Sequence, residues 1–261
     1  KAGRQKTDDT LVQQIIRSRD IFEALGVPIY EHVSFEADDM LGTIVEQTKG
    51  NKDLQVIIAS GDMDTLQLVD NNKVLVYTLK KGINDTVLYN ETAVRGRFNF
   101  GPSQVPDYKG LRGDPSDNIA GIKNLGVRRL IALVPEIKTE PLTMEDLLEK
   151  FNILFEQDSH NNLIKNLMTG VTKHGVLGEE FYNVNKRIVS LDEPFLTEEA
   201  EESIKSLMTD VMDPEGRSYK NTMKMMMEDG LFKYLPKDDD AWLKFLTPFM
   251  KLTRKEKRKI K

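Results

Sequence analysis

The sequence predicts an α/β protein in which a mostly parallel central sheet is followed by a region of helices. The first observation is the continuously apolar run Val56–Ala59, which is typical of a parallel strand covered on both faces. The second is that an amphipathic helix precedes this run and another strand, residues 74–79, follows it, an alternation characteristic of an α/β sheet. The third is the change after Thr92 to a helical pattern punctuated by glycine and proline.

The elements before the apolar run follow from hydrophobic periodicity. Apolar residues share one face of a helix with Asp8 and Asp9 at its start, where negative charge suits the helix dipole: Leu11, Ile15, Phe22 and Leu25. Gly26 and Pro28 end this helix, and a short strand is expected over residues 27–33. The next helix opens at Glu36 and carries its apolar residues on one face.

The elements after the apolar run are a hairpin and a series of helices. The strand over residues 74–79 is expected to turn at residues 80–86 and to return as a second strand over residues 87–89. Helices are expected over residues 142–155 and 198–207. The sequence contains no internal repeat.

Composition excludes several classes of protein. With 261 residues, 39% of them hydrophobic, the chain can bury a core and is not disordered as a whole. It has no membrane-spanning apolar run and no signal-peptide core, so a soluble intracellular protein is expected. The net charge of −5 argues weakly against nonspecific coating of nucleic acid. Because the chain lacks cysteine, any metal would bind to oxygen or to three histidines far apart in sequence: His32, His160 and His174.

Two clusters of carboxylates are the main candidates for chemistry. The first contains Glu36, Asp38 and Asp39 at a helix N-terminus, and the second contains Asp62 and Asp64 directly after the buried strand. The carboxyl ends of strands are where ligands bind in open α/β sheets. Acids gathered there repel one another without cations, and an all-oxygen donor set favours Mg²⁺ or Mn²⁺. Either cluster alone is also explained by ordinary helix capping and turn chemistry.

A third segment strengthens the metal interpretation. Asp114 and Asp117 lie in a tight loop, and small turn residues beyond it lead into a helix with a basic first turn. Turn glycines before a helix present backbone N–H groups that bind phosphate. The candidate phosphate-binding residues of this segment are Gly121, Lys123, Gly126, Arg128 and Arg129.

These motifs together resemble the 5′ nuclease family, which includes the 5′→3′ exonuclease domain of bacterial DNA polymerase I, phage 5′ exonucleases and flap endonucleases. The resemblance covers about half of the chain, as far as Leu133, and the second half looks more like that of a phage enzyme. The motifs that carry it are Lys1-Ala2-Gly3-Arg4, Glu36-Ala37-Asp38-Asp39, Gly61-Asp62-Met63-Asp64 with Gln67-Leu68, and Leu111-Arg112-Gly113-Asp114 through Asp117-Asn118-Ile119.

The resemblance implies a role for each matching acid. Glu36 and Asp38 correspond to ligands of a first metal ion, with Asp39 beside them as a supporting acid. The central acids and the acids of a second metal site correspond to Asp62, Asp64, Asp114 and Asp117. The implied cofactors are two Mg²⁺ ions, for which Mn²⁺ can substitute.

The resemblance also implies a DNA-binding surface. Residues 117–133 match the helix-three-turn-helix that grips duplex DNA in this family, often with a bound K⁺ in its turn. Lys1 and Arg4 correspond to the end of the family's helical arch, where they would contact 5′ phosphates. Asn124 stands where the family usually has glycine, and asparagine tolerates the left-handed backbone that glycine would adopt.

The expected domain organisation follows from these assignments. Residues 1–100 are expected to form the α/β metal-binding nuclease core, and residues 101–261 the helix-three-turn-helix and a C-terminal helical region. A complete family member begins with two further acid-bearing strands and most of the arch. Because these are absent from the sequence, the first metal site lacks two expected carboxylates and the sheet lacks strands that would cover Val56–Ala59.

The expected function is structure-specific, metal-dependent hydrolysis of phosphodiesters at 5′ ends or flaps during replication or repair. The expected partners are branched or nicked duplex DNA, RNA·DNA hybrids, replication proteins and a polypeptide that supplies the missing strands. The expected location is the cytoplasm of a bacterial or phage-infected cell, near the nucleoid. The alternative is a non-catalytic DNA-binding subunit or fragment; a phosphatase of small substrates is disfavoured, because it would not need the turn motif.

Overall fold

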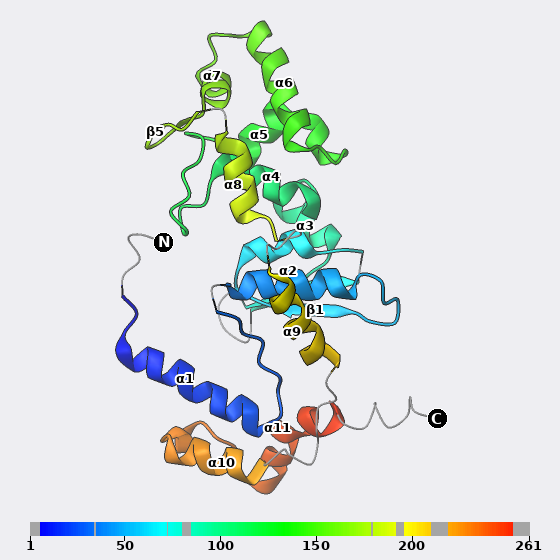
Figure 1. Cartoon of the computed structure of the whole chain (residues 1–261), viewed down its shortest axis with the longest axis vertical. Helices are drawn as coiled ribbons and strands as arrows, with labels where there is room; N and C mark the ends of the chain where they lie inside the picture. Colours follow the sequence, from blue (N-terminus) through cyan, green and yellow to red (C-terminus); the bar gives the residue numbers. More distant parts are fainter. Residues whose placement is uncertain are drawn as a thin grey trace. The chain divides into compact units, whose positions relative to one another are not determined.

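The computed structural model describes residues 6–33, 35–71, 73–79, 85–178, 180–191, 196–209 and 219–252. The chain folds as two compact units, one built on His32–Glu201 and one that combines residues 5–31 with residues 202–261. Figure 1 labels the helices and strands along the chain. Across the part of the chain that the structure describes, no helix is both long enough and apolar enough to cross a membrane.

The second unit is formed by helices from both ends of the chain. Helix α1 (Asp9–Ala24) contacts α10 (Tyr219–Glu228), and Arg17 Nε lies 2.9 Å from an Asp229 carboxylate oxygen. The unit also contains η4 (Leu231–Lys233) and α11 (Asp239–Leu252). The first helix is therefore confirmed. The strand expected over residues 27–33 is wrong, because the described residues offer that segment no strand to pair with and it follows the left-handed Gly26 as a loop.

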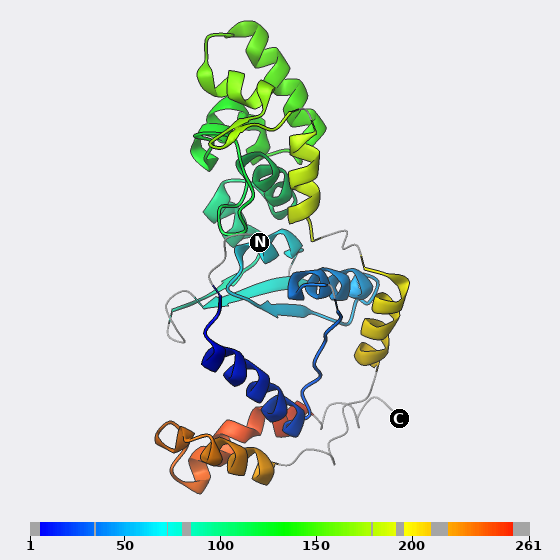
Figure 2. The ribbon, with the colours of Figure 1, turned by 60° about the vertical axis from the view of Figure 1, so that its left-hand side comes forward.

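The first unit contains a three-stranded mixed sheet. Strand β1 (Val56–Ala59) pairs in parallel with β2 (Val74–Leu79), and β2 pairs in antiparallel fashion with β3 (Thr86–Tyr89). Helix α2 (Ala37–Thr48) packs against β1 on one face of this sheet (Figure 2). The predicted α/β class and hairpin are confirmed, although one strand pair is parallel and the other antiparallel.

The opposite face of the sheet is apolar and exposed. Ile57 is 57% exposed, Tyr77 38% and Leu88 50%, whereas Ile58 on the other face of β1 is buried. The expectation that β1 is covered on both faces is therefore wrong for the described residues. The physical reason is that α2 packs against one face of β1, which buries Ile58, whereas Ile57 on the other face stays exposed.

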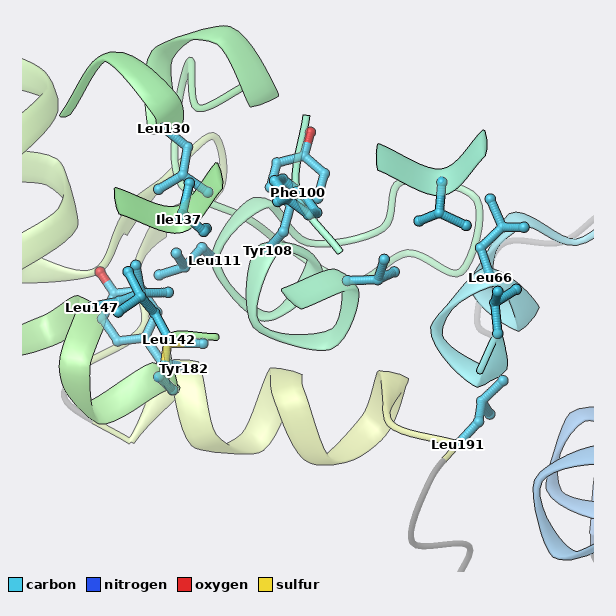
Figure 3. Close-up of a cluster of buried hydrophobic side chains, with 14 of the residues drawn as sticks. Leu66, Phe100, Tyr108, Leu111, Leu130, Ile137, Leu142, Leu147, Tyr182 and Leu191 are labelled. Atoms are coloured by element: carbon cyan, nitrogen blue, oxygen red, sulfur yellow. The ribbon is translucent and has the colours of Figure 1, made fainter. Parts of the chain in front are cut away.

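The helices of the first unit share one hydrophobic core with the sheet. Figure 3 shows this core from Leu66 through Phe100 and Tyr108 to Leu130 and Leu147. The core is continuous across residue 100. The division into residues 1–100 and residues 101–261 stays a prediction. The remaining elements are η1 (Met63–Leu68), α3 (Glu91–Phe98), η2 (Pro102–Gln104), α4 (Val105–Arg112), α5 (Val127–Leu133), η3 (Pro135–Lys138), α6 (Met144–Gln157), α7 (Asn162–Thr169), β4 (Val171–Thr172), β5 (Gly175–Val176), α8 (Phe181–Val189) and α9 (Glu198–Thr209).

Asn185 of α8 fixes the end of α4 to the loop that follows it. Its buried side-chain amide donates to Gly110 O at 3.1 Å and to Ala120 O at 2.8 Å. We expect Asn185→Ala to lower the free energy of unfolding by about 2 kcal/mol, because two carbonyls lose their donor. Urea unfolding measures the effect, and Asn183→Ala at an exposed position of the same helix is the control. Equal stability of the two variants would contradict this role.

Candidate metal centre and nucleic-acid interface

The acids at the start of α2 have distinct environments. Glu36 is the exposed N-cap residue of the helix, and Asp38 and Asp39 in the first turn are partly buried. The backbone N–H of Glu36 donates to Asp39 Oδ2 at 2.9 Å. Asp39 thus performs ordinary helix capping, which is consistent with its predicted place beside the metal ligands rather than among them.

The acids after β1 are positioned by a short 3-10 helix. Asp62 is exposed and caps η1, because its Oδ1 accepts the backbone N–H of Asp64 at 2.9 Å. The N–H of Asp62 in turn donates to Ser60 Oγ at 3.0 Å. Asp64 is buried, so its carboxylate requires a charged or hydrogen-bonding partner.

That partner is Lys109, in the last turn of α4. Its ammonium group forms ion pairs with both Asp64 and Asp114, at 2.6 Å in the case of Asp114 Oδ2. The side chains of all three residues are nearly buried, at 11–12% exposure. Two carboxylates from separate segments of the chain, those of Asp64 and Asp114, thus contact the same ammonium group. Sequence analysis did not single out Lys109, and the only available signal was a lysine one helical turn before the Gly113-Asp114 motif.

Asp114 is also held by its own loop. Its Oδ1 accepts hydrogen bonds from the backbone N–H of Ser116, at 2.9 Å, and from the Ser116 hydroxyl. Burial alone would raise the pKa of Asp114, but the hydrogen bonds from Lys109 and Ser116 outweigh burial and lower the pKa to about 2. The carboxylate is therefore ionised at neutral pH.

This lowered pKa predicts a pH dependence of stability. The folded pKa of about 2 lies below the reference value of 3.8, so ionised Asp114 stabilises the fold above about pH 4 and the contribution is lost as the pH falls toward 2. Between about pH 5 and 2, in EDTA, we expect the unfolding free energy of the wild type to fall by about 2 kcal/mol more than that of Asp114→Asn. Urea unfolding at each pH measures this difference. Parallel pH curves would contradict the assignment.

A buried glutamine links the acid-bearing turn to α8. Gln67 Nε2 donates to Asp64 O and to Val189 O, both at 2.9 Å, and Gln67 Oε1 accepts the N–H of Leu191 at 2.8 Å. Both N–H groups of the Gln67 amide and one of the two lone pairs of its oxygen are thus engaged, and these hydrogen bonds hold η1 in place. The Gln67-Leu68 motif therefore has a supporting role in placing Asp64.

The donor chemistry of this site suits a divalent cation. Asp64 and Asp114 offer carboxylate oxygens that already converge on a cationic group, and oxygen donors favour Mg²⁺ or Mn²⁺. Within the described ranges, no three Asp, Glu or His side chains gather closely enough to hold one metal ion. The wider ligand set therefore stays a prediction, and it comprises Glu36, Asp38, Asp62, Asp64, Asp114 and Asp117.

The loop between α4 and α5 depends on left-handed residues. Gly113 has a φ of +70°, and Asn124 has a φ of +66°. The prediction that Asn124 keeps the left-handed backbone is confirmed. Gly121 packs so tightly on the end of α4 that an added Cβ would lie 1.4 Å from Arg112 O. Gly121 is thus required by packing, whatever its contribution to phosphate binding.

The basic residues of this segment are exposed, and one of them also forms a hydrogen bond within the turn. Lys123, Arg128 and Arg129 are exposed, and Arg129 Nη1 donates to Asn124 O at 2.8 Å, which stabilises the turn. Gly126 is the N-cap residue of α5. Their contacts with DNA, and a K⁺ ion in the turn, stay predictions. The remaining two predicted DNA-binding residues lie outside the described residues: Lys1 and Arg4.

Comparison with known proteins finds similarity to 5′ nucleases. A family model described as the 5′-3′ exonuclease N-terminal resolvase-like domain matches residues 1–99. DNA polymerase I of Caldicellulosiruptor bescii is 34% identical over 194 residues, which are 73% of this chain and 20% of that protein. Over the matched residues the chain is similar to 5′ nucleases, and these matches support a 5′ nuclease family member. DNA polymerase I of Bacillus subtilis is 36% identical over 152 residues, which are 58% of this chain and 17% of that protein.

Solved structures of 5′ nucleases share the fold. The phage T5 5′-exonuclease with bound zinc superposes with a TM-score of 0.60 and 21% identity, covering 79% of this chain and 72% of that one. A phage T5 flap endonuclease complex with DNA and metal ions has a TM-score of 0.56 and 19% identity, covering 87% of this chain and 74% of that one. The chain spans about a fifth of the length of the DNA polymerases that it matches.

Proposed function

We propose that this chain is a structure-specific, divalent-metal-dependent 5′ nuclease that hydrolyses phosphodiesters at 5′ ends or flaps of DNA. The observation that carries the proposal is the convergence of buried Asp64 and Asp114 on Lys109, directly before the loop that leads into α5. Similarity to the 5′ nuclease family supports it, because the matched family model describes a 5′-3′ exonuclease domain.

The proposed cofactor is a pair of Mg²⁺ ions, for which Mn²⁺ can substitute. The T5 neighbours support a divalent metal, since their structures contain zinc or other metal ions. Two such ions supply an activated water and charge stabilisation in phosphodiester hydrolysis. The residues that would hold them are Glu36, Asp38, Asp62, Asp64, Asp114 and Asp117.

The protein's own contribution is to concentrate and orient charge. Lys109 keeps two carboxylates at one point in a nearly buried site, which prevents their mutual repulsion from opening it. Its ammonium can also donate to a phosphate oxygen, because lysine has three donors on a flexible stem. Gln67 and Ser116 hold the two acid-bearing turns in place, so that little rearrangement is needed on binding.

The proposed substrates are branched or nicked duplex DNA and RNA·DNA hybrids. Phosphates would be positioned by backbone N–H groups and by basic side chains, so affinity depends on salt and hardly on base sequence. The residues proposed for this task are Lys1, Arg4, Gly121, Lys123, Gly126, Arg128 and Arg129, with K⁺ in the turn. We further propose that the protein acts with replication proteins in the cytoplasm of a bacterial or phage-infected cell.

The experiment that tests this proposal compares end-labelled substrates that share one duplex. A 5′ flap, a nicked duplex, an RNA·DNA hybrid, a 3′ flap and a blunt duplex are incubated with Mg²⁺, and the products are sized on a gel. We expect short products from the 5′ end of the flap and nick substrates and none from the 3′ flap. Equal cleavage of the 3′ flap would contradict 5′ specificity.

A second candidate function is favoured by the exposed sheet face. Ile57, Tyr77 and Leu88 form an exposed apolar surface that another polypeptide could cover. In this alternative the chain binds DNA but requires another polypeptide for cleavage. Binding of flap DNA without cleavage in Mg²⁺ would favour it.

A further inference from the structure

Lys109 contacts two of the carboxylates that are proposed to hold a metal ion. Its ammonium group forms ion pairs with Asp64 Oδ1 and with Asp114 Oδ2, the latter at 2.6 Å. The side chains of the three residues are only 11–12% exposed, so little water is available to replace a lost partner. The point where the two acids converge is therefore already occupied by one positive charge.

Both oxygens of Asp114 are engaged within the chain. Oδ1 accepts the backbone N–H of Ser116 at 2.9 Å and also the Ser116 hydroxyl, while Oδ2 contacts Lys109. The hydrogen bonds from Ser116 belong to the loop itself, whereas the ammonium group lies at the end of a flexible side chain from the last turn of α4. A divalent cation therefore gains an oxygen of Asp114 most readily by displacing Lys109.

An ammonium group and a divalent cation repel each other at such a site. The repulsion is strong because the surroundings are nearly buried and both cations would lie against the same carboxylates. Asp64 and Asp114 supply two negative charges, which neutralise a divalent cation alone but not together with Lys109. Within the described ranges, no third acidic side chain lies close enough to complete a metal-binding group with them.

We propose that Lys109 competes with the divalent metal, so that a metal ion binds Asp64 and Asp114 only when the ammonium group leaves both carboxylates. The inference rests on the proposed function and adds to it a control of metal affinity by this chain. The flexible stem of Lys109 lets the ammonium group move away while α4 stays in place. Lys109 is a positioning residue in this role, because it acts through the two acids.

The first test measures Mn²⁺ binding to Lys109→Met, which keeps the length of the side chain and removes its charge. Free Mn²⁺ is quantified by electron paramagnetic resonance at constant pH and ionic strength. We expect Lys109→Met to bind Mn²⁺ at least about 10-fold more tightly than the wild type, because the cation no longer displaces a positive charge. Lys109→Arg keeps the charge and should bind Mn²⁺ as weakly as the wild type.

The matched control is Lys186→Met. Lys186 of α8 pairs with the buried Asp107 of α4, with Nζ 2.7 Å from Oδ1, so this variant also removes the cation from a buried aspartate. It should bind Mn²⁺ with the affinity of the wild type. If Lys109 serves only to hold the two acids together, Lys109→Met lets them move apart and binds Mn²⁺ more weakly, which would overturn the inference.

The second test uses the wild type and decides the question if Lys109→Met does not fold. The protein is treated briefly with an amine-acylating reagent, with and without saturating Mg²⁺, and each labelled lysine is quantified by mass spectrometry. We expect Mg²⁺ to raise the acylation of Lys109 several-fold, because its ammonium group leaves the ion pairs, and to leave Lys186 unchanged. Equal acylation of Lys109 in both conditions would contradict the displacement.

The outcomes separate this inference from the proposed function. If neither the wild type nor Lys109→Met binds Mn²⁺ at millimolar concentrations, the proposed metal dependence is overturned and the inference with it. If the wild type binds Mn²⁺ and Lys109→Met binds it equally well or more weakly, the inference alone is overturned.

Discussion

Asp64→Asn is expected to lower the rate of Mg²⁺-dependent flap cleavage by at least about 10³-fold, which corresponds to about 4 kcal/mol of lost transition-state stabilisation. The substitution keeps the size of the side chain but removes its charge, so the site loses an anionic oxygen donor. It also leaves Asp114 as the remaining ion-pair partner of Lys109 among the described residues, so that an excess of positive charge stays near the site. Single-turnover cleavage of a 5′-labelled flap measures the effect.

The control for this prediction is Asp85→Asn, which replaces an exposed aspartate directly before β3. It makes the same change in net charge away from the converging acids and should cleave at the wild-type rate. Duplex binding in EDTA should be retained by both variants, which separates a loss of chemistry from a loss of folding. Cleavage by Asp64→Asn at a near-normal rate would contradict the assignment of Asp64 as a metal ligand.

Replacement of both Arg128 and Arg129 by alanine is expected to weaken duplex binding about 30-fold at low salt. Each guanidinium that neutralises a phosphate contributes about 0.9 to the slope of log K against log salt, so the slope should fall by nearly 2. The side chain of Arg129 already donates to Asn124 O, so part of the loss reflects a looser turn. Anisotropy titrations at several salt concentrations measure both quantities.

The matched control replaces two exposed lysines elsewhere in the chain, Lys52 and Lys205. It has the same change in net charge and should show the wild-type slope. Arg128→Lys with Arg129→Lys should recover much of the affinity, because the charge remains. Unchanged duplex binding by the double alanine variant would contradict the assignment of Arg128 and Arg129 as phosphate-binding residues.

Much of the sheet was predictable because its signals are local. The apolar run Val56–Ala59 became β1 with the predicted bounds, and the helix opening at Glu36 became α2. The left-handed backbone of Asn124 was expected because the resemblance places this residue where the family usually has glycine, and asparagine tolerates that backbone. In contrast, the strand expected over residues 27–33 depended on a pairing partner, which no local pattern can supply.

The parts of the site that could not be predicted depend on tertiary contacts. Lys109 reads in the sequence as an ordinary helical lysine, and its pairing with Asp64 arises only because α4 packs beside η1. The hairpin that bears Lys173 and His174 was missed because β4 and β5 have two residues each, too few for a period-2 pattern.

The most direct test of the central claim is cleavage of a 5′-labelled flap by this 261-residue chain, in parallel reactions with Mg²⁺ and with EDTA. The account predicts release of short 5′-labelled products in Mg²⁺ and none in EDTA, at a rate that depends on Asp64. Cleavage that continues in EDTA, or a chain that neither cuts nor binds the flap, would contradict it.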